Sequence, residues 1–465
     1  AVAFLAEVLI LPATIKLLPR VFGADALRAA RRGAAAAAAC VLLLSFPGAG
    51  EAQSLSKPAG HLSVTTAEAP SRDTLELRAR AFVEQKADLS HHVRVTGSAF
   101  IEGLVRRHPD PPAPERETSE ITGDAIFKVH DAFVESTVGR LDLRIGLARV
   151  VWGRLDEVQP TDVVNPLDVS RFFFEGRSEA RLPVALVRAQ VFLSDRASLE
   201  GVYVPVFRRG RFDQLDEPSS PFTPRSGPAD AIGGVCLAIG CPTLPPLIVD
   251  HEPTVTLDTA QGGARLNATT GRLDWSVSAF RGFEPFPVFE PGTPQPGAPL
   301  PIHGTHPRFT MLGGDFETAR GEWGMRGEVA ALVDDNFQAA ALRPAEGSSV
   351  DAGVGVDRRA GDYRISGTLL FHYEAIDLPI RETRSSLSWV LSADRRFSRE
   401  RYALRAFGVA NTSEGSGFAR LIATGELRDN LALEGSIGWF VGEGRDLVGR
   451  FADSDFIYVR LKHYF

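Results

Sequence analysis

Long apolar stretches are missing from most of this 465-residue sequence. After Gln53 no apolar run reaches the roughly twenty residues that a membrane-spanning helix needs. There is also no basic patch with interleaved aromatic residues, which argues against a nucleic-acid partner. The motifs G-x-S-x-G and H-E-x-x-H and a phosphate-cradling loop are absent as well. The sequence therefore predicts neither an enzyme nor a bound cofactor.

Cysteine is scarce, with 3 residues in the whole chain. Cys40 lies in a segment that we expect to be removed, which leaves Cys236 and Cys241 in a turn-rich stretch. No histidine or further cysteine lies close to this pair, so a metal site is not predicted. A pair five residues apart in an exported protein more often forms a loop disulfide, and two unpaired thiols are the alternative.

Glycine, proline and phenylalanine are abundant, with 44, 31 and 29 residues, and the formal net charge is −7. The mean hydropathy of −0.04 fits neither a helical membrane protein nor a disordered chain. A membrane β-barrel has such an average because lipid-facing apolar residues alternate with lumen-facing polar ones.

The first part of the chain resembles an export signal rather than a folded domain. Residues 28–52 have a basic start, an apolar middle and small residues that end at Ala52. We expect cleavage there and a mature chain from Gln53. Residues 53–73 are then a periplasmic segment with a possible first strand, and residues 74–465 form the barrel.

Strict alternation of apolar and polar residues runs through the rest of the sequence. At the C-terminus Ile457, Val459 and Leu461 share one face, opposite Tyr458 and Arg460. Similar runs of about ten residues, the length of a tilted membrane strand, lie at 141–147, 273–279, 363–373, 387–394 and 431–441. A soluble β-sandwich also alternates, but its strands are usually nearer five or six residues.

The final residues, Tyr464 and Phe465, resemble the signal that the barrel-assembly machinery reads in outer-membrane proteins. His463 departs from that pattern, because an aromatic residue usually stands there. An ordinary last strand of a soluble domain is the alternative.

Connections between the strands fall into two kinds. Tight turns are predicted at 194–196, 270–271, 320–321, 360–361 and 428–430, and long loops at 152–183, 208–258, 282–306 and 334–348. The loop 282–306 is so rich in proline that we expect no strand in it. A strand near His61–Thr66 would complete eighteen. The predicted fold is all-β, a transmembrane antiparallel up-and-down β-barrel of 16–18 strands with long extracellular loops, in a bacterial outer membrane among its lipids and lipopolysaccharide.

Residues 152–183 combine many charges with prolines and a run of phenylalanines. We expect Val151 to end an upward strand, so that this segment begins at the outer rim and folds into the lumen as a constriction. The candidate pore residues are Arg154, Asp156, Glu157, Asp162, Asp168 and Arg171 of the segment and Arg144, Arg364 and Arg460 of the wall. A rim loop held by salt bridges is the alternative.

Residues 129–174 resemble the core of an outer-membrane barrel family catalogued as domain of unknown function 1302. The resemblance is carried by the LRIG run Leu143–Gly146, the V-W-G segment Val151–Gly153 and the N-P-x-D loop Asn165–Asp168. It implies a porin-like barrel, often encoded beside exporters of the resistance-nodulation-division (RND) type, without an established substrate.

Residues 1–22, with the run LAEVLILPATIKLL, resemble the C-terminal tail of an RND-type lipid exporter. The expectation is that residues 1–27 are an extension produced by a gene start drawn too far upstream. A longer signal or an inner-membrane anchor is the alternative.

Together these observations predict a porin-like channel or export conduit, working with an RND exporter on a hydrophobic or lipid cargo. Two other functions stay open. Asp250–His251 and Asp334–Asp335, in predicted outer loops, would serve an outer-membrane protease or phospholipase. The other open function is that of a structural barrel that conducts nothing.

Overall fold

The computed structural model describes residues 54–109, 119–212, 222, 247–293, 295, 298–339, 343–377, 382–443, 446 and 448–465. The expected signal peptide, the exporter-like extension and the cysteine pair Cys236 and Cys241 lie outside these residues.

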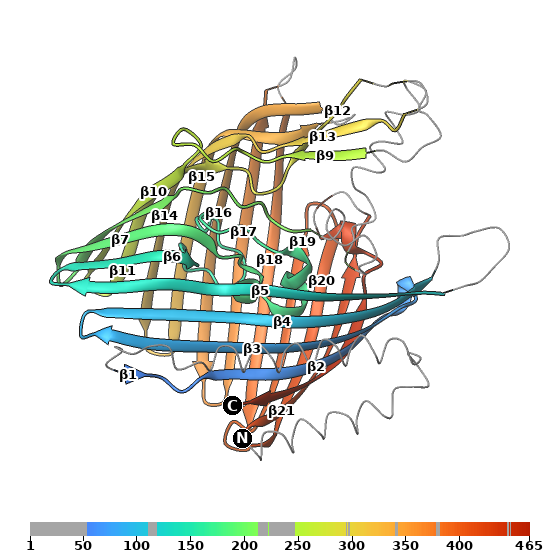
Figure 1. Ribbon diagram of the computed structural model, residues 1–465, viewed down its shortest axis with the longest axis horizontal. Coiled ribbons are helices and arrows are strands. Elements are labelled where there is room, and N and C mark those ends of the chain that lie inside the picture. The colour runs from blue at the N-terminus through green and yellow to red at the C-terminus, as the bar shows by residue number, and fades with distance from the viewer. Residues whose placement is uncertain are drawn as a thin grey trace.

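Eighteen of the described strands form one closed antiparallel barrel (Figure 1). Each strand pairs with the next along the wall, and β2 pairs with β22 to close the ring, with His61 opposite Tyr464. The expected additional strand near residues 61–66 is β2. The wall strands are β2 (Ala59–Ala69), β3 (Thr74–Ser90), β4 (Val93–Pro109), β5 (Ser119–Val138), β6 (Leu141–Ala148), β7 (Val184–Ser194), β8 (Ala197–Val204), β10 (Gln261–Thr270), β11 (Leu273–Phe283), β14 (Arg308–Arg320), β15 (Trp323–Ala339), β16 (Arg343–Ala360), β17 (Tyr363–Ile376), β18 (Glu382–Phe397), β19 (Tyr402–Asn411), β20 (Ser416–Arg428), β21 (Leu431–Val441) and β22 (Phe456–Tyr464).

The remaining elements are short and are not among the eighteen wall strands. Among them β1 (Ser54–Leu55) pairs with the end of β3. The others are η1 (Pro70–Arg72), α4 (Val169–Glu175), α5 (Arg177–Ala180), β9 (Leu247–His251), β12 (Val288–Pro291), β13 (Pro301–Thr305) and η3 (Gly449–Phe451). No helix of the described part of the chain is long and apolar enough to span a membrane.

All five predicted tight turns lie at the end of the barrel where the chain finishes, which we call the turn end. The longer connections lie at the opposite, loop end. Two loop predictions are wrong. Most of 334–348 belongs to β15 and β16, which continue to Ala339 and from Arg343. The stretch 282–306 contains β12 and β13, which form a small sheet with β9. Pro291 ends β12 and Pro301 begins β13, positions where a missing backbone N–H is tolerated.

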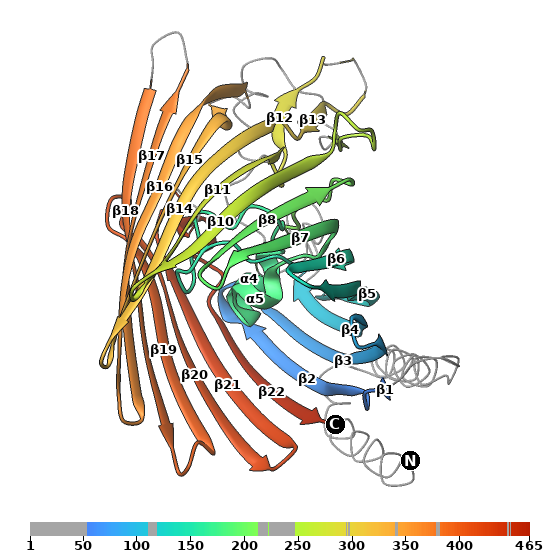
Figure 2. The ribbon, with the colours of Figure 1, turned by 90° about the vertical axis from the view of Figure 1, so that its left-hand side faces the viewer.

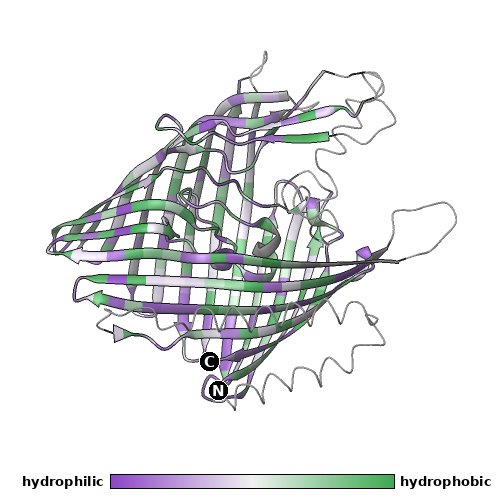
Figure 3. Ribbon diagram, viewed as in Figure 1, coloured by the Kyte–Doolittle hydropathy of each residue, from purple (hydrophilic) through white to green (hydrophobic). Residues whose placement is uncertain are grey.

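Hydrophobic and hydrophilic residues alternate along the wall strands (Figure 3), and the burial of their side chains shows that the two faces of the wall differ. Outward-pointing Ile457 and Val459 are exposed, whereas Tyr458 and Arg460 between them are buried toward the lumen. Aromatic side chains mark both edges of the apolar outer surface, with Trp323, Tyr363 and Tyr402 near the turn end and Tyr373, Trp389 and Trp439 nearer the loop end. An apolar band between aromatic girdles is the outer surface of a transmembrane barrel.

Two apolar clusters lie inside the barrel, where a general pore would hold water. The Trp152 cluster joins β7, β8, β11, β14 and β15 to the chain that follows β6; its buried members are Ala148, Val150, Trp152, Val164, Val184, Leu186, Val202, Val204, Phe280, Phe309, Met311 and Ala330. The Phe173 cluster joins α4 to β2 and β20–β22; its buried members are Ala67, Phe173, Phe174, Phe222, Phe418, Phe440, Phe451, Phe456 and Tyr458.

Candidate channel constriction

Residues 149–183, which we call the inner segment, leave the wall after β6 and cross the lumen before the chain re-enters the wall as β7. Figure 2 shows its two short helices, α4 and α5, inside the curve of the strands. The prediction that Val151 ends the preceding strand is wrong, because β6 already ends at Ala148. The segment therefore departs three residues earlier than expected.

Asn165 of the N-P-x-D loop ties the two ends of the inner segment together. Its side-chain Oδ1 accepts from the Val150 backbone N–H at 2.8 Å, and its Nδ2 donates to the carbonyl oxygens of Ala148 and Leu182 at 3.2 and 2.8 Å. These bonds satisfy backbone groups that would otherwise be buried without partners. Asn165 of the N-P-x-D motif thus holds the two ends of the inner segment in place.

Trp152 of the V-W-G run is the main apolar anchor of the segment. It is 1% exposed, and its Nε1–H donates to Glu200 of β8 at 2.7 Å. Its ring meets Phe280 edge-on, with centroids 6.1 Å apart. A Cβ atom at Gly263 of β10 would lie 2.9 Å from Cη2 of Trp152, so this ring fits only against glycine.

Leu155 and Arg154 extend the attachment to β14–β16. The Leu155 side chain lies against Gly353, where a Cβ would come within 2.6 Å of its Cδ1. Arg154 donates from Nε to Asp315 at 2.6 Å, and its backbone N–H donates to Glu328 at 2.6 Å. Asp315 also pairs with Arg265 at 2.8 Å, so the contact belongs to a buried polar network.

The tip of the segment carries two carboxylates that face arginines on the opposite wall. Asp156 pairs with Arg326 at 2.6 Å and with Arg364 at 3.3 Å. Glu157 pairs with Arg405 at 2.5 Å. The side chains of Asp156 and Arg405 are 37% and 41% exposed, so these pairs border open space rather than a packed core.

Asp162 and Asp168 lie away from this tip. The side chain of Asp162 is fully buried and pairs with Arg177 at 3.2 Å and with Arg181, both within the segment. Asp168 is also fully buried, 3.9 Å from Lys128 of β5. Arg144 pairs with Glu135 on the neighbouring wall strand. The side chain of Arg171 lies outside the described part.

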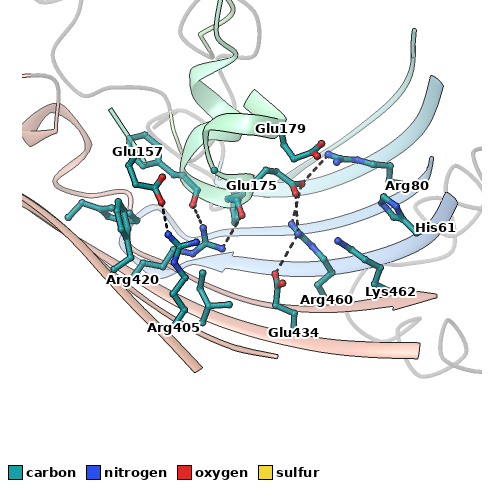
Figure 4. Close-up of a pocket in the computed structure, with 16 residues that line it drawn as sticks. His61, Arg80, Glu157, Glu175, Glu179, Arg405, Arg420, Glu434, Arg460 and Lys462 are labelled. Carbon is teal, nitrogen blue, oxygen red and sulfur yellow. Dashed lines mark hydrogen bonds and ion pairs between the residues drawn. The ribbon is translucent and has the colours of Figure 1, made fainter. Parts of the chain in front are cut away.

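At its far side the segment is held by α4. Phe173 and Phe174 enter their aromatic cluster, and buried Arg420 of β20 donates to the carbonyl oxygens of these two residues at 2.8 and 3.0 Å. Glu175, the last residue of α4, pairs with Arg80 and Arg460 from opposite sides of the barrel seam (Figure 4).

A cavity of about 250 Å³ remains between α4 and the wall. Five cationic side chains and four carboxylates line it, so it is strongly polar. They are Arg80, Arg405, Arg420, Arg460 and Lys462, with Glu157, Glu175, Glu179 and Glu434. Phe407 and Phe418 add apolar surface.

The structure thus brings Arg154, Asp156, Glu157, Arg364 and Arg460 to the contacts between segment and wall. Sequence reasoning missed their partners Arg326, Asp315, Glu317 and Glu175. Charge alone does not reveal such partners, but glycines inside strands, as in G-V-G-V at 353–356, are a signal of close approach.

The residues considered for hydrolysis have structural partners. Asp250 accepts from Nε2 of His306 at 3.0 Å, and His251 stacks on His303. Asp334 and Asp335 lie in β15 rather than in a loop, and Asp335 accepts from Ser349. Among the described residues no group of three or more His, Cys, Asp or Glu side chains could hold a metal ion.

The C-terminal residues secure the seam of the barrel. The backbone N–H of Phe465 donates to the carbonyl oxygen of Gly60, and the backbone N–H of Gly60 donates to the carbonyl oxygen of Phe465, both at 3.1 Å. Tyr464 donates through its backbone to Asn430 at 2.8 Å. Their recognition by the assembly machinery stays a prediction.

An 18-stranded closed barrel with an apolar outer band and a charged segment across its lumen is a porin-like transmembrane β-barrel. The model of the family described as "Protein of unknown function (DUF1302)" matches residues 75–353. The chain belongs to this family, which confirms the resemblance drawn from residues 129–174.

Several solved outer-membrane barrels are similar in structure. OccK7 (OpdD) of Pseudomonas aeruginosa is 9% identical, with a TM-score of 0.48 over 88% of this chain and 97% of its own. OccK5 (OpdH) of the same organism is 10% identical, with a TM-score of 0.48 over 90% and 98%. OmpT, an outer membrane protein of Vibrio cholerae, is 8% identical, with a TM-score of 0.40 over 90% and 100%. No curated protein matches the sequence.

Proposed function

We propose that the protein is a passive channel of the bacterial outer membrane and that its inner segment narrows the lumen to a charged passage. The observation that carries this proposal is the partial exposure of the ion pairs at the segment's tip. Asp156, Arg405 and Glu317 keep 37–41% of their side-chain surface exposed although they point into the barrel. Charged groups inside a barrel stay hydrated only where water fills the lumen.

The outer surface supports the proposed location. Exposed apolar side chains cover the outside of the wall, as with Ile365, Leu391 and Val459. A closed barrel with this surface pairs its wall backbone groups internally and is stable in hydrocarbon. The expected signal peptide fits export to the same membrane.

Single-channel conductance of the refolded mature chain from Gln53 tests the proposal. We expect steady conductance that rises when residues 155–178 are deleted, because the charged constriction is then removed. Folding of both proteins is checked by resistance of the barrel to unfolding in detergent. Silence in both folded proteins would contradict the channel and favour a structural barrel or a hydrolase, which peptide and lipid hydrolysis assays separate.

A partnership with an RND-type exporter is a further proposal. It is supported by the resemblance of residues 1–22 and by the family resemblance. The polar cavity beside α4 favours charged solutes over the lipid cargo expected from sequence, because an apolar lipid chain in this cavity would displace water from the charged side chains that line it. Crosslinking in intact cells followed by purification of the barrel tests this partnership, and recovery without any inner-membrane exporter would contradict it.

A further inference from the structure

A group of cationic side chains lines the lumen where the first and last strands of the barrel meet. Arg80 of β3, Arg460 of β22 and Lys462 of β22 point toward one another here, beside His61 of β2 (Figure 4). All four side chains line the cavity beside α4. Such a group of positive charges in a confined site attracts an anion.

In the present structure the anion is supplied by the protein itself. One carboxylate oxygen of Glu175 lies 3.2 Å from Nη2 of Arg80, and the two oxygens lie 3.1 and 3.2 Å from Nη1 and Nη2 of Arg460. The contact with Arg460 uses both carboxylate oxygens. This two-point geometry is the one in which guanidinium groups recognise carboxylates.

The two arginines are held in place by the wall and do not depend on Glu175 for their position. Nε of Arg80 donates to Glu102 at 2.7 Å, and Nε of Arg460 donates to Thr65 at 3.1 Å. Their side chains are only 10% and 8% exposed. If Glu175 withdrew, Arg80 would keep its pair with Glu102 at 2.7 Å and Arg460 would keep Glu434 at 3.5 Å, so both guanidinium groups would stay aligned. The guanidinium nitrogens that now contact Glu175 would then be open to another carboxylate.

Lys462 is the cation that Glu175 leaves unused. It lies two residues after Arg460 on the same face of β22, and within the described part of the chain it makes no ion pair. Its Nζ lies 6.0 Å from the ring centre of Tyr464, a weak contact. It is therefore available to a second acceptor oxygen.

Glu175 is also well placed to leave. It is the last residue of α4, and Gly176 follows it with a φ of 79° and with no atom within 4 Å of the place where a Cβ would stand. The rest of α4 is held independently by the Phe173 cluster and by Arg420. A change of the Glu175 side-chain rotamer is enough to vacate the arginines without moving the helix.

We propose that Arg80, Arg460 and Lys462 form a binding subsite for the carboxylate of a small solute, which Glu175 occupies in the absence of that solute. Its role in passage rests on the proposed channel function, because a subsite beside the constriction selects what reaches it. Binding itself is independent of conduction. A solute carboxylate competes with Glu175 for the same two arginines.

Isothermal titration of the refolded barrel with succinate tests this subsite. We expect Glu175→Gln to bind succinate at least about tenfold more tightly than the wild type, because a tethered competitor acts at an effective concentration in the millimolar range. Lys462→Gln should weaken binding in the Glu175→Gln background. Glu322→Gln, an equal change on a tight turn outside the lumen, should leave the affinity at the wild-type value.

Equal succinate affinity for Glu175→Gln and the wild type would overturn the subsite. Inorganic phosphate and uncharged succinamide serve as further probes. Phosphate binding Glu175→Gln more tightly than succinate would overturn the assignment to a carboxylate, and so would equal binding of succinamide.

Conductance of the same proteins separates the two proposals. If the Glu175→Gln barrel conducts but does not bind succinate, the proposed subsite is contradicted and the proposed channel is not. If the barrel binds succinate but does not conduct, the proposed channel is contradicted and the proposed subsite is not.

Discussion

Trp152 and the Asp156–Glu157 tip lie only a few residues apart in the inner segment, yet they attach to the wall in opposite ways. Trp152 is 1% exposed and packs against apolar side chains, with one hydrogen bond to Glu200. Asp156 is 37% exposed and contacts only charged groups across the lumen. The two contacts therefore have different roles. The buried apolar surface of Trp152 holds the segment in place, whereas the hydrated charges of Asp156 and Glu157 set the local electric field in the lumen.

The largest expected effect comes from breaking the apolar attachment. Trp152→Ala removes a buried ring and leaves Glu200 without its indole donor, so we expect a loss of about 3–5 kcal/mol in the free energy of unfolding. Urea unfolding of the refolded barrel measures this loss. Trp152→Phe, which keeps much of the ring, should lose less. A cost below about 1 kcal/mol for the alanine variant would show that the segment is held elsewhere.

A buried carboxyl of the loop end extends the comparison to an acidic group that has no cationic partner among the described residues. Glu284 lies between β11 and β12, where burial and the neighbouring carboxyl of Asp335 raise the pKa of Glu284 to about 8. Because the folded state holds this proton more tightly than the ordinary carboxyl with its pKa of 4.5, the stabilising contribution is complete below pH 4.5 and is lost as the pH rises to about 8.

Hydrogen exchange of residues 284–293 measures this loss. We expect their protection to fall between about pH 5 and pH 8 in the wild type after correction for the intrinsic exchange rate. Glu284→Gln, which cannot ionise, should keep its protection across the same range. If protection declined equally in the wild type and in Glu284→Gln, the pH dependence would arise from a group other than Glu284.

The smallest effect on stability is expected at the tip. Replacing Asp156 by Asn and Glu157 by Gln together should cost no more than about 1 kcal/mol in unfolding, since both pairs are partly hydrated. The same change leaves Arg326, Arg364 and Arg405 without these carboxylates and should shift the reversal potential in a potassium chloride gradient toward anion selectivity. Glu322→Gln is the matched control. A loss of stability as large as that of Trp152→Ala would abolish the distinction between the two attachments.

Much of the wall was predictable because apolar side chains that face lipid alternate along each strand with polar side chains that face the lumen. The run at 457–461 and the tight turn at 360–361 lie where the sequence places them. The errors fall at the loop end. Asp334, Asp335 and Asn336 resemble a loop in sequence, yet backbone pairing with β16 continues through Asn336 opposite Glu346, beyond a bulge at Asp334. Once both faces are polar, composition no longer distinguishes a strand from a loop.

The candidate constriction was predictable as a segment but not as a set of contacts. The charges and prolines of residues 152–183 indicate a loop that cannot lie in lipid, and the structure places it in the lumen. The same pattern gave no reason to separate buried Asp162 from the exposed carboxylate of Asp156. That difference depends on Arg177 and Arg181, which fold back onto Asp162.

The sequence by itself determined which side chains face lipid and which face the lumen, because successive residues of a strand point to opposite faces. It also determined where the chain turns, through glycine and aspartate at the tight connections. Only the tertiary structure decided which charges meet. The pairs Arg154–Asp315, Glu157–Arg405 and Glu175–Arg460 are separated by 161, 248 and 285 residues. These distances along the chain are bridged only when the ring of strands closes and fixes the width of the lumen that the inner segment must cross.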